Sequence, residues 1–344
     1  MEYRTLGASG LRVSPICLGT MMFGKVTPED EAAMIVAAAF EAGINFIDTA
    51  AVYADGRGEE IVGRLVAPHR DEWVIATKVG PPTGAGPNDA GTGRRHVRAD
   101  MERSLRRLGT DHVDVYYLHE DDPVTPLEES VRAMGDVVHQ GKALYWGVSN
   151  FRAWRLAEAV AIARATGVPA PIVVQPYYHA LNRRPEVELL PAATHFGLGV
   201  VPYSPIARGI LSGKYRPGEP PPADSRAGRA DKEILGREWR DDSMRIAAAM
   251  AARARSRGMS PVHFAVNWLL SNRHVTSILA GPRTLSQWKE YLGVFDHGFD
   301  ADDAAFVDTL VPPGSASSHG WHDPEYPLTG RLHRDVVPAR AARG

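Results

Sequence analysis

The sequence predicts an α/β fold in which eight parallel strands close into a (β/α)8, or TIM, barrel. Apolar runs of strand length alternate with helical patterns through most of the 344 residues. That alternation is typical of βα units built around a parallel sheet. Eight strands suit a closed barrel, because closure removes the exposed edges that an open parallel sheet has to protect. An open doubly wound sheet is the alternative.

The expected strands are short apolar segments bounded by polar residues. In chain order they cover residues 16–19, 45–48, 73–78, 113–119, 145–149, 173–176, 199–203 and 277–281. We expect a single domain over 1–344, with the barrel at about 14–311, a short β-hairpin before it and a tail at 312–344 over the barrel mouth.

The helices between these strands show spacing and capping signals. Thr27 is a candidate N-cap with Pro28 at the first helical position, and Ser260-Pro261 opens a later helix in the same way. Apolar residues recur at helical spacing and are expected to pack on the barrel, among them Met101, Leu105, Leu108, Leu127, Val131, Met134 and Val138.

Two segments interrupt the alternation. Residues 216–229 are rich in Pro, Gly and Arg, and form either a disordered surface insertion or a segment that orders over a ligand. The tail beyond Pro312 is irregular but carries Trp321, His322, Pro324, Tyr326 and Pro327, a content that indicates docking before the chain frays.

Composition favours work on small molecules in the cytoplasm. The net charge of -2 gives no general basic field for nucleic acid or an acidic membrane. No secretory apolar core follows Met1, and no run approaches the roughly 18 apolar residues of a membrane span. The single cysteine, Cys17, lies in an apolar strand and is expected to be a buried hydrophobe. The sequence does not predict the oligomeric state.

Four residues are candidates for chemistry. Asp48, Lys78 and His119 each close an apolar strand, and Tyr53 follows Asp48 by five residues. In a parallel barrel the carboxyl ends of the strands share one face, and reactive groups gather there. We therefore expect these side chains to meet.

The expected chemistry is proton donation to a carbonyl. A Lys ammonium beside a carboxylate stays charged, and it lowers the phenol pKa from about 10 toward neutrality. The phenol then supplies a proton, while His119 hydrogen-bonds the same oxygen. A metal site at His119-Glu120-Asp121-Asp122 is the alternative, but adjacent residues seldom face one centre, so no metal is predicted.

The chain resembles the aldo-keto reductases, and within that family the bacterial enzymes related to potassium-channel β-subunits. The motifs occur in the family's order from Tyr3 to about Leu292: Ile47-Asp48-Thr49-Ala50 with Tyr53, the strand ending in Lys78, Tyr116-Tyr117-Leu118-His119, Gly147-Val148-Ser149-Asn150-Phe151, Gln175, and the run from Tyr203-Ser204-Pro205 to Gly213-Lys214. The resemblance implies that Tyr53 is the general acid, that Asp48 and Lys78 tune it, and that His119 orients the substrate.

A nicotinamide cofactor is implied, although the sequence has no Rossmann glycine motif that opens a helix after a strand. A barrel can instead bind phosphate in the loops after its last two strands. The resemblance places Tyr203 against the nicotinamide ring. It places the pyrophosphate along the residues that follow, with further contacts from the first strand's loop: Ser204, Pro205, Ile206, Ala207, Arg208, Gly209, Leu211, Lys214, Thr20 and Met21.

The rest of the implied cofactor site lies on three other strands. Asp48, Ser149, Asn150 and Gln175 are implied around the nicotinamide end, and Gly281, Arg283, Gln287 and Glu290 around the adenosine. An Arg at 283 favours NADPH over NADH, because a guanidinium gains most from the 2′-phosphate that NADH lacks. A plain surface Arg at a helix start is the alternative.

Substrate residues are less defined. Met22, Phe23 and His119 are expected to contact a carbonyl substrate, and Tyr177-Tyr178 either line the same apolar mouth or belong to the core. The chain departs from the family at Glu120-Asp121-Asp122, where Arg-Pro-Asp is frequent, and at Tyr291, where Asn is frequent. The overall expectation is NADPH-dependent reduction of an aldehyde or ketone. A cofactor-binding regulatory barrel with little turnover is the alternative.

Overall fold

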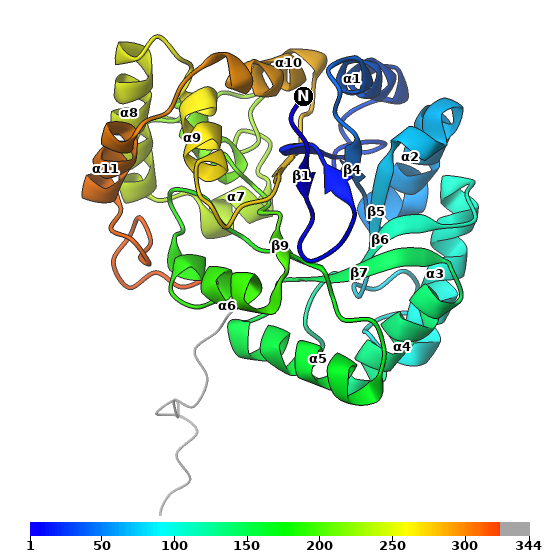
Figure 1. Cartoon of the computed structure of the whole chain (residues 1–344). Coiled ribbons are helices and arrows are strands. Elements are labelled where there is room, and N and C mark those ends of the chain that lie inside the picture. The colour runs from blue at the N-terminus through cyan, green and yellow to red at the C-terminus, as the bar shows by residue number, and fades with distance from the viewer. Residues whose placement is uncertain (324–344) are drawn as a thin grey trace, which may run out of the picture.

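The computed structural model describes residues 1–323, and its centre is a closed parallel barrel (Figure 1). The eight-stranded sheet of this part of the chain has the order β10-β3-β4-β5-β6-β7-β8-β9, and every neighbouring pair is parallel. Parallel bridges Val200–Val275 and Tyr203–Leu279 join the two ends of this order. The predicted (β/α)8 barrel is therefore confirmed, and the open sheet is excluded.

The strands agree with the predicted segments to within a few residues. They are β3 (Ile16–Gly19), β4 (Phe46–Asp48), β5 (Val74–Val79), β6 (Val113–Leu118), β7 (Ala143–Ser149), β8 (Val173–Gln175), β9 (Gly199–Val200) and β10 (Ile278–Ala280). The largest difference is at β9, which ends at Val200, two residues before Pro202, a residue that has no N–H to donate to a ladder.

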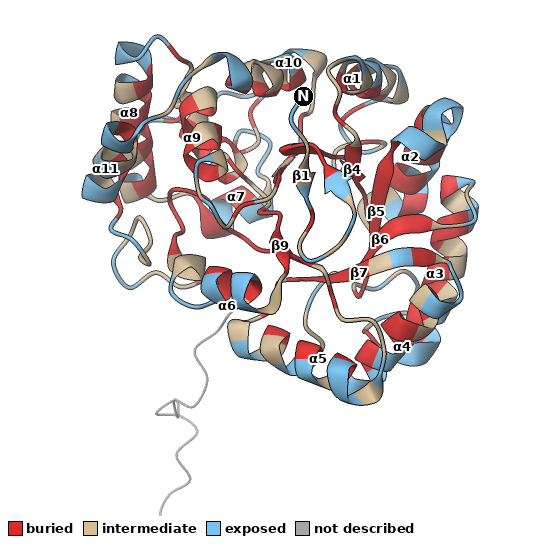
Figure 2. Cartoon of the chain, in the orientation of Figure 1, coloured by how far each residue is buried: buried red, intermediate tan, exposed pale blue. Residues whose placement is uncertain are grey.

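Helices surround the barrel and turn their apolar faces toward it (Figure 2). Those that alternate with the strands are α1 (Glu29–Glu41), α2 (Arg57–Val66), α3 (Arg94–Leu108), α4 (Leu127–His139), α5 (Ala153–Thr166), α6 (Leu189–Phe196), α9 (Pro261–Leu270) and α10 (Leu285–Leu292). Three more, α7 (Lys232–Arg237), α8 (Asp241–Ser256) and α11 (Ala301–Leu310), lie outside this alternation. Met101, Leu105, Leu108, Leu127, Val131 and Met134 are buried as predicted, and Val138 packs on the same core while partly buried.

One of the two predicted helix caps is wrong. Ser260 accepts a hydrogen bond from the backbone N–H of His263 and caps α9 as expected. The Thr27 hydroxyl instead donates to the carbonyl of Arg283, and Pro28 occupies the N-cap position without a capping side chain. Thr27 therefore ties the start of α1 to the loop after β10.

The predicted hairpin, β1 (Arg4–Thr5) with β2 (Arg12–Val13), covers one end of the barrel. Leu6 and Val13 are fully buried in the same apolar cluster as the residues inside the barrel. Gly7, at φ +58°, lies so close to the amino-terminal ends of β8 and β9 that a Cβ there would come within 2.2 Å of the Ile172 carbonyl oxygen. The carboxyl ends of the strands, and with them the barrel mouth, are at the opposite end, which faces away from the viewer in Figure 1.

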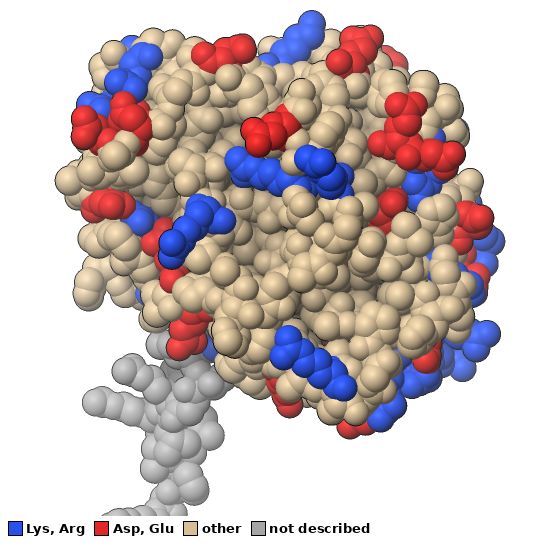
Figure 3. Space-filling model, viewed as in Figure 1, with Lys and Arg blue, Asp and Glu red and all other residues tan. Residues whose placement is uncertain are grey.

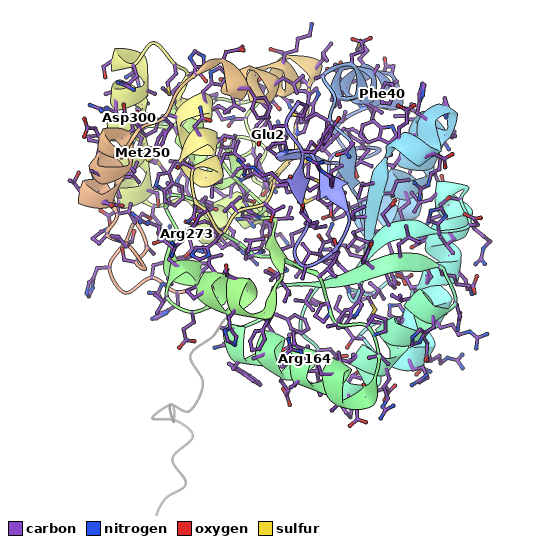
Figure 4. The ribbon with its side chains drawn as sticks, in the orientation of Figure 1. Glu2, Phe40, Arg164, Met250, Arg273 and Asp300 are labelled. Carbon is purple, nitrogen blue, oxygen red and sulfur yellow. The ribbon has the colours of Figure 1, made fainter. Side chains whose placement is uncertain are left out.

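A cluster of buried residues that includes Phe46, Val115 and Tyr117 fills the barrel interior, so it is a packed core and not a channel. Figure 4 draws the side chains of the described residues on the ribbon. Cys17 is fully buried there, as expected for a structural cysteine, and burial raises the pKa of its thiol well above the usual value. Basic and acidic side chains are interspersed on the hairpin face (Figure 3), in keeping with the small net charge. Within residues 1–323, none of the helices has the length and apolar character needed to cross a membrane.

The two irregular segments are both packed. In the 216–229 segment, Ser225 and Ala227 are buried, and the Ala227 N–H donates to the Tyr215 hydroxyl at 3.4 Å. The described tail runs beside the loop after β8, where the Ser317 N–H donates to the Leu181 carbonyl at 3.0 Å and Tyr177 meets Trp321 edge-on. Three tail residues that the sequence singled out, Pro324, Tyr326 and Pro327, lie outside the described residues.

Candidate functional site

A buried ion pair lies at the carboxyl ends of β4 and β5. Both side chains, Asp48 and Lys78, are fully buried, and the Lys78 ammonium donates to Asp48 Oδ1. The same ammonium donates to the Thr49 carbonyl at 2.7 Å, and Gln175 Nε2 donates to Asp48 Oδ2 at 3.0 Å. A buried charge pair requires this kind of complete hydrogen bonding, so the pair is held in one arrangement.

Tyr53 lies above this pair in the loop that leaves β4, where it begins a short 3-10 turn (Tyr53–Gly56). Its hydroxyl accepts a hydrogen bond from the Lys78 ammonium at 3.4 Å. The two residues after it, Ala54 and Asp55, have φ of 50° and 56°, a left-handed conformation that non-glycine residues seldom adopt. Backbone strain of this kind persists where neighbouring contacts hold it, and it is frequent at functional sites.

His119, directly after β6, is the fourth member of this group. Its ring meets the Tyr53 ring edge-on, with the centroids 6.0 Å apart. Asn150 Nδ2 donates to the His119 carbonyl at 3.0 Å, which fixes the backbone at this strand end. The structure therefore brings together Asp48, Tyr53, Lys78 and His119, as the sequence predicted.

The protonation states in this group follow from burial and from the neighbouring charges. Burial disfavours the Lys78 ammonium, but Asp48 and Tyr53 outweigh it, so the pKa of Lys78 lies above its usual value. Burial, helped by the Lys78 charge, lowers the pKa of His119 to about 3 and leaves the ring neutral.

The sequence predicted that Lys78 lowers the pKa of Tyr53 toward neutrality. That prediction is wrong, because the net change in the pKa of Tyr53 is upward. Burial raises the pKa of the Tyr53 phenol by more than the Lys78 charge lowers it. The phenol is therefore protonated at neutral pH, with a proton available to donate.

The group opens into a cavity of about 630 Å³ at the barrel mouth. Most of the residues predicted for cofactor and substrate line it: Thr20, Met21, Met22, Asp48, Tyr53, His119, Ser149, Asn150, Gln175, Tyr203, Ser204, Pro205, Ile206, Arg208, Gly209, Lys214, Gly281, Arg283, Gln287 and Glu290. Lys78 does not line the cavity, but its ammonium contacts two residues that do, Asp48 and Tyr53.

Several predicted residues are not part of the cavity wall. Phe23 is fully buried in the core against the surrounding helices, and so are Ala207 and Leu211. These three side chains point into the core and so anchor the loops that carry the wall residues. Tyr177 and Tyr178 are also buried, so the core interpretation of this pair is the one that the structure supports.

A hydrogen-bonded row crosses the ends of β7, β8 and β9. The Ser149 hydroxyl donates to the Gln175 carbonyl at 3.0 Å, and the Tyr203 hydroxyl donates to Asn150 Oδ1 at 2.9 Å. The Tyr203 ring also faces the Tyr177 ring at a centroid distance of 5.5 Å. Polar atoms and one aromatic ring are thus fixed side by side along the cavity wall.

The loop after β9 has an unusual backbone. Ser204, Ala207 and Arg208 have φ of 60°, 49° and 51°, and Gly209 follows at 106°. The Arg208 guanidinium turns to two carboxylates, with Nη1 3.0 Å from Glu238 Oε1 and Nη2 3.4 Å from a Glu233 oxygen. Arg208 is thus held by side chains of the α7 region that the sequence did not indicate.

The loop after β10 forms the other end of the cavity. Thr284 caps α10 by accepting from the Gln287 N–H, and Gln287 Oε1 accepts from the Arg283 N–H at 2.8 Å. The Arg283 guanidinium faces Asp224, with Nη2 3.7 Å from Oδ2. A cation thus stands beside the start of a helix, an arrangement suited to anions.

Sequence reasoning missed several wall residues, most of them charged. The 216–229 segment and α7 contribute Asp224, Ser225, Arg226, Arg229, Glu233 and Arg237, and Pro81, Glu120 and Tyr291 also line the cavity. The density of arginines in an otherwise Pro- and Gly-rich segment was the available signal. The structure shows 216–229 packed along the cavity and not as a disordered surface insertion.

The acidic run after His119 separates into different contacts. Asp121 Oδ1 accepts from Arg155 Nε at 2.9 Å, and Asp122 accepts from the N–H groups of Thr92 and Val124, each at 2.9 Å. Only Glu120 reaches the cavity. These contacts fix the loop between β6 and α4 and explain two of the three carboxylates without a metal.

Known proteins match this chain over most of its length. It is 40% identical to a probable voltage-gated potassium channel subunit beta of Oryza sativa, a match that covers 86% of this chain and 92% of that protein. It is 35% identical to the uncharacterized oxidoreductase YrpG of Bacillus subtilis, over 93% and 99% of the two chains. It is 34% identical to the L-glyceraldehyde 3-phosphate reductase of Escherichia coli O157:H7, over 91% and 93%.

Residues 15–312 also match the Aldo/keto reductase family, and they include the barrel and every residue of the candidate site. The chain therefore belongs to the aldo/keto reductase family of oxidoreductases, and its (β/α)8 barrel with a cluster of polar side chains at the mouth agrees with this.

Proposed function

We propose that this protein reduces an aldehyde or ketone to an alcohol with NADPH, and that Tyr53 is the general acid. One observation carries the proposal: a protonated phenol, a buried Lys78–Asp48 pair and a neutral His119 ring meet at one cavity. This set can donate a proton to a carbonyl oxygen and stabilise the charge that forms on the phenol.

The residues of the cavity fit a nicotinamide nucleotide. Arg283 at the start of α10 suits a 2′-phosphate, and Lys214, beside the loop after β9, suits the pyrophosphate. Ser149, Asn150 and Gln175 offer the mixed donors and acceptors that a carboxamide needs. When bound, NADPH supplies the hydride, and these residues hold and orient it.

The proton path uses only side chains of this chain. The Tyr53 phenol donates its proton to the carbonyl oxygen. The Lys78 ammonium stabilises the resulting phenolate, because it lies 3.4 Å from the Tyr53 oxygen. A neutral His119 retains one ring N–H that can donate to the same carbonyl oxygen. Met22 and Pro81 give the substrate end an apolar surface, next to the Glu120 carboxylate.

A regulatory role is the second candidate, because the chain is 40% identical to a probable potassium channel subunit beta. In that case the barrel binds NADPH tightly but turns over little. For the reductase we propose the cytoplasm as its place and small-molecule carbonyls as its partners, with no nucleic acid or membrane.

A nucleotide titration followed by a carbonyl panel separates these candidates. NADPH and NADH are titrated in parallel by nicotinamide fluorescence, and NADPH oxidation is then followed at 340 nm with 4-nitrobenzaldehyde and aliphatic aldehydes. The reductase proposal expects tighter binding of NADPH and turnover on at least one aldehyde. Tight binding with no turnover across the panel supports the regulatory role, and the absence of nucleotide binding contradicts both.

A further inference from the structure

A fully buried carboxylate lies behind the cavity wall, in the segment between α7 and α8. We propose that Glu238 is a positioning residue for the nucleotide site. It fixes Arg208 and Tyr177, and the Tyr203 ring packs against the Tyr177 ring. The inference depends on the proposed function, since it takes the Tyr203 side of the cavity to hold the nicotinamide end of the cofactor.

Glu238 binds side chains from two other parts of the barrel. Its Oε1 accepts from the Tyr177 hydroxyl after β8 and from Arg208 Nη1, at 3.0 Å, after β9. His179 Nε2 lies 3.3 Å from the same oxygen. Burial alone would raise the pKa of Glu238, but these neighbours hold it at about 2, so the carboxylate is charged. One charge therefore joins two loops of the barrel mouth.

The groups held by Glu238 form a stack that ends at the cavity. The Arg208 guanidinium lies 4.9 Å from the centre of the Tyr177 ring, and the Tyr177 ring lies 5.5 Å from the Tyr203 ring. Cation–π and offset aromatic contacts favour this geometry. Tyr203 lines the cavity, whereas Tyr177 and Glu238 are not in its wall. Glu238 thus acts on the cavity through the stack.

The backbone of the loop after β9 depends on the same contact. Ala207 and Arg208 are consecutive non-glycine residues with left-handed φ, and such a conformation persists only where neighbouring contacts fix it. The Arg208 side chain is 6% exposed, whereas its other carboxylate partner, Glu233, is 52% exposed. An exposed carboxylate holds a cation weakly. Glu238 is therefore the contact that keeps Arg208, and with it the turn, in place.

Substitution Glu238→Gln tests this role, because it keeps the shape and one acceptor oxygen but removes the charge. We expect the Kd of NADPH to rise about tenfold, the size that weakening one charged hydrogen bond gives. The Kd of adenosine 2′,5′-bisphosphate should change less than twofold, because Arg283 and Gln287 lie on the separate loop after β10. The KM for NADPH should rise in parallel, with kcat at saturating NADPH reduced less than threefold.

A matched control removes a buried charge elsewhere. Asp303, in α11, is fully buried and accepts from Arg253 Nε, in α8, at 2.8 Å. These two helices lie at the edge of the molecule, where Met250 and Asp300 are labelled in Figure 4. Asp303→Asn should lower the melting temperature and leave the Kd of NADPH unchanged. If Glu238→Gln does not fold, Tyr177→Phe removes one hydroxyl from the same cluster and should raise that Kd about threefold.

The outcomes separate this inference from the proposed function. An unchanged Kd of NADPH in a folded Glu238→Gln variant, or in Tyr177→Phe where it replaces that variant, overturns the positioning role. An equal loss of affinity for NADPH and for the bisphosphate also overturns it, because the damage would then be general. Wild-type protein that binds no nicotinamide nucleotide contradicts the proposed function, and this inference falls with it.

Discussion

The two sides of the cavity are fixed by different means. Asp48, Lys78 and His119 lie at or directly after the ends of neighbouring strands, and β-ladder register sets their relative positions. Arg208 and Arg283 lie in loops and contact carboxylates distant in sequence: the buried Glu238 holds Arg208, whereas the exposed Asp224 lies 3.7 Å from Arg283. Residues on strands are thus placed by the backbone ladder, whereas the placement of residues on loops depends on side-chain contacts between distant parts of the chain.

The largest effect on stability is expected where the strand-end side loses a charge. Lys78→Met leaves Asp48 buried without its cation, so the free energy of unfolding should fall by about 3 kcal/mol. Carbonyl reduction should fall at least about 100-fold. Urea unfolding and the 340 nm assay measure the two effects.

The double variant Asp48→Asn with Lys78→Met is the control for this prediction. It removes both charges, so most of the lost stability should return while activity stays low. A double variant as unstable as Lys78→Met alone would mean that packing, and not the unpaired charge, causes the loss.

On the loop side, Arg283→Gln should weaken the binding of NADPH but not that of NADH. The guanidinium faces the cavity at the start of α10, and a charged contact to a phosphate changes affinity by about 10- to 100-fold. We expect the Kd of NADPH to rise by about that factor and the Kd of NADH to stay within twofold. Fluorescence titration with both nucleotides checks this, and equal losses for the two would remove Arg283 from 2′-phosphate recognition.

The low pKa of His119 predicts a pH-dependent contribution to stability. The pKa of His119 is about 3 in the folded protein and 6.5 in the unfolded chain. Between pH 3 and pH 6.5 the unfolded chain therefore binds one more proton than the folded protein. The contribution is fully present above pH 6.5 and is lost as the pH falls toward 3. Between pH 7 and pH 5 the wild type should lose about 2 kcal/mol more than His119→Gln.

Urea unfolding of both proteins at these two pH values makes the comparison. Equal losses would show that His119 titrates near its ordinary value in the folded protein. The activity profile gives a second check, since a permanently neutral ring adds no inflection to kcat between pH 5 and pH 8.

The smallest effect is expected at Asp224. Its side chain is 84% exposed and lies 3.7 Å from the Arg283 guanidinium, so the pair is weak. Asp224→Asn should release Arg283 and lower the Kd of NADPH about twofold, without changing the Kd of NADH. A weaker binding of NADPH by this variant would instead indicate that Asp224 helps to form the nucleotide site.

The sequence was sufficient to predict the strand-end side of the site. Apolar runs that end in Asp48, Lys78 and His119 place these residues at one face of any parallel barrel, and the structure brings them together. Tyr53 lies in a loop, so its place over Lys78 depends on the left-handed turn at Ala54 and Asp55, which no periodic pattern indicates.

The loop side could be predicted only in part, because its contacts join residues far apart in the chain. Neither Glu238 nor the arginines of 216–229 stand at a strand end, and their places follow from how the α7 region folds onto the barrel. The same cause explains why Phe23, Ala207 and Leu211 were assigned to the site. Their loops reach the cavity, but these side chains turn into the core.

The most direct test of the account is the turnover number of Tyr53→Phe with NADPH and 4-nitrobenzaldehyde. The variant keeps the ring and loses only the hydroxyl that lies 3.4 Å from the Lys78 ammonium. We predict a kcat lower by about 100- to 10,000-fold, with the melting temperature and the Kd of NADPH unchanged. A kcat within threefold of the wild type would contradict the central claim that Tyr53 donates the proton.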